Sequence, residues 1–246
     1  MKTEIKTFSD PAQLNRAAAE MFVETGSRAI EEKEKFTVAL AGGSTPKSLF
    51  RLLSSEDFRD KIEWQKVFFF FGDERNVLPN EKESNFLMAR ENLLQPLKIR
   101  NENVFRWKTE LGDAEKIAAD YGQTIKDFFN LREGEFPRFD LIFLGMGGDG
   151  HTASLFPNTP ALRENEKIAA ANPLEKSNAV RLTLTFAAIN SAENVIFLIK
   201  GADKAEMLRT ILKGDFQPDK FPAQNIQPKN GNLYWLIDRK AAQFLN

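Results

Sequence analysis

Short apolar runs alternate with longer amphipathic stretches from one end of the chain to the other. Six of the runs are predicted to be strands: residues 36–40, 67–71, 140–144, 181–184, 194–199 and 233–237. They are apolar throughout rather than alternating with polar residues, which is typical of a mainly parallel sheet covered by helices on both faces. The pattern therefore predicts an α/β fold and argues against a β-sandwich.

The helices are predicted from capping residues that precede a stretch with apolar periodicity. Such starts occur at Asp10-Pro11, Thr45-Pro46, Ser84, Asp113 and Asp203. The chain contains no repeat, no low-complexity tract and no long linker. We therefore expect a single domain over residues 1–246, with surface loops at 158–166 and 215–229.

Composition narrows the classes of ligand and compartment. Lys and Arg number 34 and Asp and Glu 35, so a net charge of −1 gives no general attraction to nucleic acid or to a membrane surface. Any anionic ligand must be held locally. The absence of cysteine excludes disulfides and thiolate chemistry. Because no apolar run approaches the roughly 20 residues of a membrane span and the start lacks a signal-like core, we expect a soluble cytoplasmic protein.

In open α/β sheets ligands bind beyond the carboxyl ends of the strands, and the first such end carries "AGGSTP". Gly42 and Gly43 let backbone N–H groups approach a ligand. Ser44 opens a helix, whose N-terminus carries partial positive charge, so a phosphate fits there. The alternative is an ordinary strand-to-helix turn capped by Thr45.

The second strand end, in "FFFFGDERNV", delivers Asp73, Glu74 and Arg75 directly after a strongly apolar run. An arginine at this position has the fork geometry for a phosphate or carboxylate. The alternative is a solvated turn with a local Glu–Arg pair. Ser84-Asn85 further on is explained by helix capping alone.

The third strand end, "FDLIFLGMGGDGHTASLFP", contains a G-x-G-x-x-G pattern and His151, the single histidine of the chain. A dinucleotide site requires a full helix after the third glycine, but Pro157 stops any helix early, and the next strand candidate, 168–171, ends without an acidic residue. The glycines instead form a turn that carries Asp149 and His151, and we predict a functional histidine. One histidine without cysteine argues against zinc; magnesium at Asp73, Glu74 or Asp149 stays open.

Two further cations stand near strand ends. Arg181 enters a strand in "VRLTLTF", and Lys204 lies in the first turn of the helix that Asp203 is predicted to cap. Either cation is able to contact an anion, although Lys204 is equally typical of a solvated helix residue.

The segments "AGGSTP", "GDERNV", "ESNF", "GDGHTASLFP", "VRLTLTF" and "YWLIDRKAA" follow one another in an order and spacing that resemble the monofunctional bacterial 6-phosphogluconolactonases. The resemblance covers nearly the whole chain. It implies a Rossmann-like fold shared with sugar-phosphate isomerases and deaminases, and hydrolysis of 6-phosphoglucono-1,5-lactone in the oxidative pentose phosphate pathway without metal or organic cofactor. Gly148 and the position of Pro79 depart from the family pattern, which affects loop shape rather than chemistry.

By this resemblance His151 is the general base on water, and Asp149 orients the loop or the imidazole. Backbone N–H groups at Gly147 and Gly148 are expected to bind the oxyanion. The candidates for contact with phosphate and sugar hydroxyls are Gly43, Ser44, Asp73, Arg75, Arg181 and Lys204.

The expected partner is a small sugar phosphate, with no nucleic acid or membrane, and the expected state is a monomer or weak homo-oligomer. A lactone is an activated ester and needs no covalent nucleophile, and no G-x-S-x-G elbow is present. The alternatives are a glucosamine-6-phosphate deaminase or isomerase, whose motifs continue differently after "DE" and "GH", and a non-catalytic sugar-phosphate sensor.

Overall fold

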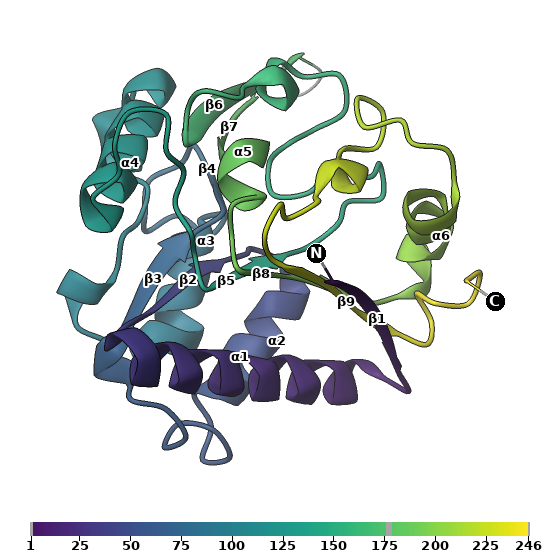
Figure 1. Ribbon diagram of the computed structural model, residues 1–246, viewed down its shortest axis with the longest axis horizontal. Coiled ribbons are helices and arrows are strands. Elements are labelled where there is room, and N and C mark those ends of the chain that lie inside the picture. The colour runs from purple at the N-terminus through teal and green to yellow at the C-terminus, as the bar shows by residue number, and fades with distance from the viewer. Residues whose placement is uncertain (1, 176–178, 246) are drawn as a thin grey trace.

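The computed structural model describes residues 2–175 and 179–245, and a six-stranded parallel sheet forms its centre (Figure 1). In spatial order the strands are β1 (Lys2–Phe8), β9 (Asn232–Asp238), β8 (Asn194–Ile199), β5 (Leu141–Leu144), β2 (Phe36–Leu40) and β3 (Val67–Phe71). Every neighbouring pair in this sheet runs parallel. The predicted α/β class is confirmed.

Helices cover both faces of this sheet, as the apolar strands predict. The helices are α1 (Pro11–Lys33), α2 (Ser44–Leu53), α3 (Asn85–Ala89), α4 (Ala114–Phe129), α5 (Phe186–Ile189) and α6 (Ala205–Lys213). Phe69 of β3 stacks at 6.4 Å on Trp64, which stacks on Phe22 of α1, whereas Phe70 packs at 5.1 Å against Phe128 of α4. Because consecutive side chains of a strand point to opposite faces, α1 and α4 lie on opposite sides.

Most of the predicted caps are confirmed. Asp10, Ser84 and Asp113 each accept a hydrogen bond from a backbone N–H in the first turn of their helix. Asp203 is an exception, because neither the short 3₁₀ turn Ala202–Lys204 nor α6 has a side-chain cap. Thr45 is a second exception, because α2 begins at Ser44 with Gly43 as its N-cap at a φ of 100° and has no side-chain cap.

One predicted strand lies outside the central sheet. Residues 181–184 belong to β7 (Ala179–Leu184), which pairs antiparallel with β4 (Asp73–Arg75) and β6 (Ala169–Leu174) in a separate three-stranded sheet. The description of this run as apolar throughout is wrong, because Arg181 and Thr183 alternate with apolar neighbours, which is typical of a half-buried antiparallel strand. This small sheet and α5 lie above the central sheet in Figure 1.

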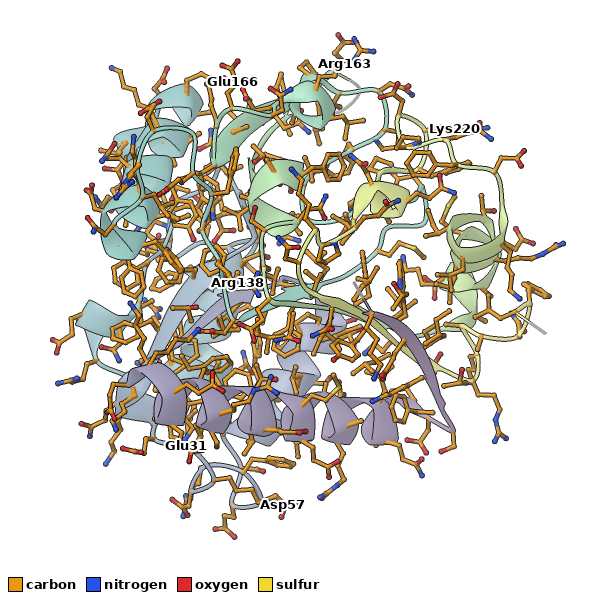
Figure 2. All side chains as sticks on the ribbon, viewed as in Figure 1. Glu31, Asp57, Arg138, Arg163, Glu166 and Lys220 are labelled. Carbon is orange, nitrogen blue, oxygen red and sulfur yellow. The ribbon has the colours of Figure 1, made fainter. Side chains whose placement is uncertain are left out.

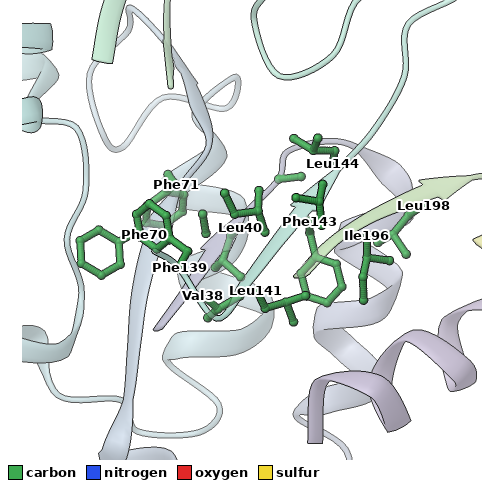
Figure 3. Packing of buried hydrophobic residues seen from close by; sticks show 14 of the residues in the cluster. Val38, Leu40, Phe70, Phe71, Phe139, Leu141, Phe143, Leu144, Ile196 and Leu198 are labelled. Carbon is green, nitrogen blue, oxygen red and sulfur yellow. The ribbon is translucent and has the colours of Figure 1, made fainter. Parts of the chain in front are cut away.

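The strands β2, β5 and β8 and the edge strand β3 are almost completely buried, and their side chains form the centre of the core (Figure 3). The chain proceeds outward from β2 to β3, then returns to β5 and proceeds outward in the other direction through β8. At such a reversal the loops after the two inner strands diverge and leave a crevice. The sheet order thus places a binding site between the carboxyl ends of β2 and β5.

Charged side chains of both signs surround the molecule. Figure 2 shows Glu31 and Asp57 at one end and Arg163, Glu166 and Lys220 at the other. Over the described ranges, no helix combines the length and the apolar character needed to cross a bilayer. The mixture of signs is in keeping with the net charge of −1.

Candidate active site

An open cavity of about 470 Å³ lies at the carboxyl ends of β2, β3 and β5. Seven of the ten predicted site residues line it: Gly43, Asp73, Arg75, Gly147, His151, Arg181 and Lys204. The other three lie beside the lining residues. Ser44 follows Gly43 and Gly148 follows Gly147 in the chain, and Asp149 is a hydrogen-bond partner of His151. The topology therefore brings together residues from five separate segments.

His151 is held on two sides. Its Nδ1 lies 2.5 Å from Oδ1 of Asp149, and its ring stacks on Phe156 with centroids 4.1 Å apart. Because Nδ1 is engaged by a carboxylate, Nδ1 carries the proton in the neutral ring and Nε2 is the basic nitrogen. About a quarter of the side chain, 27%, remains exposed in the cavity. The geometry suits proton transfer through Nε2.

Asp149 is ionised at neutral pH. Partial burial by itself raises the pKa of this carboxyl, but the hydrogen bond and charge of His151 and the backbone N–H of His151 outweigh it. The pKa of Asp149 therefore lies below its ordinary value. A carboxylate beside Nδ1 stabilises the imidazolium that forms when Nε2 takes a proton.

The glycines make room for the imidazole. A Cβ on Gly147 would lie 2.1 Å from Nδ1 of His151, so a side chain at this position is incompatible with the observed ring position. The backbone N–H of Gly147 donates to the carbonyl of His151 at 2.9 Å. The prediction that Gly147 offers an oxyanion donor is therefore wrong for this conformation, because that N–H is already bonded. The backbone N–H of Gly148 remains the candidate oxyanion donor from this turn.

Two arginines lie side by side at the cavity. Arg75 of β4 is the cross-strand partner of Arg181 of β7, and neither forms an ion pair within residues 2–175 and 179–245. Burial lowers the pKa of Arg181, and the charge of Arg75 lowers it further. Like charges directly opposite each other destabilise a sheet unless an anion compensates them. The alternative, a local ion pair between Glu74 and Arg75, is not found: the one group of Arg75 that donates to the Glu74 carboxylate is the backbone N–H.

Lys204 adds a third positive charge to the cavity lining. Its Nζ lies 3.5 Å from the carboxylate of Asp203, which is largely exposed. The N-terminus of α2 lies on the same cavity through Gly43 and contributes partial positive charge. Ser44 is exposed at this edge.

Asp73 is oriented by two residues that the sequence did not single out as functional. Its Oδ2 accepts a hydrogen bond from Ser154 at 2.8 Å, and its Oδ1 accepts one from Asn85 at 3.3 Å. The Asn85 side chain fills the space beside Gly42, where a Cβ would lie 2.0 Å from Oδ1 of Asn85. Asp73 is 9% exposed, so it shapes the cavity wall more than it faces solvent.

Glu74 is structural. It is 2% exposed and accepts hydrogen bonds from Ser84 and from the backbone N–H groups of Arg75, Asn85 and Phe86. Burial raises the pKa of Glu74, and the backbone hydrogen bonds lower it; burial has the larger effect, so the pKa lies above its ordinary value. In the part of the chain that the structure describes, no three His, Asp or Glu side chains converge as metal ligands.

Comparisons with known proteins identify a family and several relatives that resemble this chain. The family model described as glucosamine-6-phosphate isomerases/6-phosphogluconolactonase matches residues 9–235. The chain is 41% identical to 6-phosphogluconolactonase of Synechocystis sp. over 219 residues, covering 89% of this chain and 88% of the relative. It is 37% identical to 6-phosphogluconolactonase of Nostoc sp. over 246 residues, covering 100% of both.

The fold is likewise similar to solved structures. The 6-phosphogluconolactonase from Trypanosoma brucei superposes with a TM-score of 0.88 at 30% identity, over 100% of this chain and 99% of that chain. A monomeric glucosamine-6-phosphate deaminase superposes with a TM-score of 0.81 at 21% identity, over 98% and 99% of the two chains. At that identity the second likeness concerns the fold alone.

Proposed function

The chain belongs to the family of glucosamine-6-phosphate isomerases and 6-phosphogluconolactonases, and from this membership we propose that it hydrolyses 6-phospho-D-glucono-1,5-lactone to 6-phospho-D-gluconate. It is an enzyme of the 6-phosphogluconolactonase type. The observation that carries the proposed mechanism is the Asp149–His151 pair, whose imidazole lines a cavity that two adjacent arginines also line.

The proposed reaction has two steps. Nε2 of His151 removes a proton from water, whose oxygen forms a bond to the lactone carbonyl carbon and leaves a tetrahedral oxyanion. The backbone N–H of Gly148 donates to that oxyanion. When the oxyanion collapses, the bond to the ring oxygen breaks, and the imidazolium returns its proton to that oxygen as the C5 hydroxyl forms. Asp149 stabilises the imidazolium between the two steps.

The cations hold the substrate in place. Arg75 and Arg181 pair with the phosphate, and Lys204 with Gly43 and Ser44 at the start of α2 completes the anion site. Binding the remote phosphate fixes the carbonyl relative to His151, which converts binding energy into turnover.

The proposed setting follows from the reaction class. A lactone is an activated ester, so one base, one oxyanion donor and a phosphate anchor are sufficient without metal or organic cofactor. We place the activity in the oxidative pentose phosphate pathway of the cytoplasm. The acting unit is one domain over residues 1–246, as a monomer or weak homo-oligomer.

The decisive experiment is a lactonase assay with freshly generated 6-phosphogluconolactone on the wild type and on His151→Ala, corrected for spontaneous opening. Loss of the base is expected to lower kcat by about 10²–10⁴-fold and to change KM little. Added imidazole is expected to restore part of the activity of the alanine variant. A folded His151→Ala variant with wild-type turnover contradicts the role of His151.

Two further measurements on the wild-type protein distinguish the lactonase from the alternative functions. Sustained ammonium release from glucosamine 6-phosphate, with no acceleration of lactone opening, supports a deaminase instead. Calorimetric binding of 6-phosphogluconate without turnover of either substrate supports a sensor.

A further inference from the structure

A second cavity, of about 640 Å³, lies between α3 and the segment that leads to α4. Three of its lining residues are cationic, namely Arg90, Lys98 and Arg106, and no acidic residue is among the described residues that line it. Asn80 and Gln95 add amide groups, and Phe86 adds an aromatic face. None of these side chains has a role in the proposed lactone hydrolysis.

The charges in this cavity are unequally compensated. Arg106 is paired with Glu110 through two hydrogen bonds of 2.6 and 2.8 Å. Arg90 and Lys98 make no ion pair within the described ranges. Nε of Arg90 is fully buried and has no hydrogen-bond partner. A desolvated donor on a guanidinium costs free energy unless an acceptor satisfies it.

The backbone departs from regular geometry at both uncompensated cations. Arg90 begins a π-helical turn, Arg90–Leu94, closed by a hydrogen bond of 2.9 Å from the N–H of Gln95 to its carbonyl. Lys98 has a φ of 53°, which is unfavourable for a side chain of its type. Single π-turns occur frequently at functional sites. Here the irregular turns set both cations along one cavity.

Phe86 holds the two arginines over its ring. The Cζ atoms of Arg90 and Arg106 lie 5.9 and 5.4 Å from the ring centroid. Cation–π contacts of this kind restrict the guanidinium groups without neutralising them. The positive charge of Arg90 therefore stays available to a ligand.

We propose that this cavity is a second anion site, which binds the phosphate group of a small phosphorylated molecule. Arg90 and Lys98 hold the phosphate, and Asn80 and Gln95 contact polar groups on the rest of the ligand. The proposal does not depend on the lactonase reaction, because it uses none of the residues assigned to that reaction.

The second site is physically connected to the first. Asn80 belongs to the loop between β4 and α3, and Arg75 at the start of that loop donates through Nη1 to the carbonyl of Glu83 at its end at 2.5 Å. The next residues of α3 hold Glu74 and Asp73 through the Asn85 backbone and side chain. A ligand in the second cavity is thus in contact with the segment that positions Arg75.

The test is a titration of the ¹⁵N-labelled protein with inorganic phosphate, followed by NMR. We expect two separate groups of shifted amides, one within residues 80–106 and one around residues 43–45 and 147–151. In the double variant Arg90→Gln/Lys98→Gln, phosphate affinity of the first group is expected to fall at least about 10-fold, since each charged contact contributes that much or more. The second group is expected to titrate as before.

Two controls keep the outcome interpretable. Arg28→Gln/Lys213→Gln removes the same charge from exposed positions elsewhere and is expected to retain both groups. Lys98→Gln alone changes an exposed side chain and covers the case in which the double variant does not fold. Absence of shifts in residues 80–106, or equal affinity there in the double variant and its control, overturns the proposal. Loss of only the group around residues 43–45 and 147–151 counts against the active-site assignment instead.

Discussion

The position of the His151 imidazole depends on Phe156 and Gly147 as well as on Asp149. Phe156 lies against one face of the ring, and Gly147 leaves the space that the ring occupies. The carbonyl of His151 bonds back to the N–H of Gly147, so the turn closes on itself. The orientation of the base is thus determined by backbone as well as by its carboxylate partner.

A methyl group at Gly147 is expected to displace the base. In Gly147→Ala the added Cβ would lie 2.1 Å from Nδ1, so the ring must move and its contact with Asp149 must change. We expect kcat to fall at least about 10²-fold, comparable to loss of a general base, with a smaller change in KM.

The matched variant is Gly148→Ala, where an added Cβ meets no atom within 4 Å and the backbone N–H remains. It is expected to lose far less of kcat in the same steady-state assay. Equal losses of kcat in the two variants would show that crowding of the imidazole by a side chain at Gly147 is not the cause of the loss.

At the residue scale the sequence pointed to candidate chemical groups, including Asp149 beside His151, but not to the partners that lie far along the chain or depend on the folded loop. Asp149, Arg75 and Lys204 were identified because each stands next to a strand end. Ser154 was not, because it meets Asp73 across 81 positions of the chain, a distance that no local pattern spans. Phe156 belongs to the same motif as His151, but the stacking of the two rings depends on a turn that exists only in the folded loop.

Among the secondary-structure elements, β4 and α3 are joined by one buried carboxylate. Glu74 receives three backbone N–H groups and the hydroxyl of Ser84, and so serves as an anchor for the first turn of α3. Asn85 in that turn reaches Asp73 in the cavity wall. The stability of this junction is therefore linked to the shape of the active site.

Glu74→Gln is expected to lower the free energy of unfolding by about 1–3 kcal/mol at pH 7, because an amide NH₂ replaces one accepting oxygen among donors. Burial raises the pKa of Glu74 above 4.5, so the folded wild type binds this proton at higher pH than the unfolded chain. Lowering the pH from the folded pKa towards 4.5 therefore stabilises the wild type relative to the variant. The gap between them should widen as the pH falls.

Urea unfolding of both proteins between pH 7 and 5 measures this gap. Glu83→Gln, which removes an exposed carboxylate nearby and keeps the backbone carbonyl that Arg75 uses, is the control and should stay within about 0.5 kcal/mol of wild type. A gap that narrows on acidification would mean that the four hydrogen bonds outweigh burial.

The elements themselves divide into those with a strong local signal and those without. The five buried strands and the long helices were predicted, because continuous apolar runs and capped amphipathic stretches are local properties. The strand β1 was missed, since it is mostly exposed and has no apolar run. The three-residue strand β4 was missed because its partner β7 lies far along the chain and determines its conformation.

The molecule as a whole offers an anion no long-range attraction, because its net charge is −1. The cations of the cavity come from β4, β7 and the turn after β8, and only the folded chain assembles them. Recognition of phosphate is therefore a local property of the site.

Plain glucono-1,5-lactone, which lacks the phosphate, is expected to be a poor substrate. Each charge-assisted contact contributes about 1.5–3 kcal/mol, so the loss of two should lower kcat/KM by at least about 10²-fold. Part of the loss should fall on kcat, because the phosphate positions the carbonyl. Assays of both lactones at identical salt and pH, each corrected for spontaneous opening, measure the ratio; equal efficiency would remove the arginine pair from recognition.

The sheet order also governs how the chain is assembled as it is made. The edge strand β1 pairs along its full length with β9 alone, from Lys2 beside Asn232 to Phe8 beside Asp238. Synthesis proceeds from the N-terminus, so β2, β3, β5 and β8 leave the ribosome long before the partner of β1 exists. The backbone groups of β1 therefore stay unpaired until β9 has been made. β1 is thus made before the inner strands of the sheet but is incorporated after them.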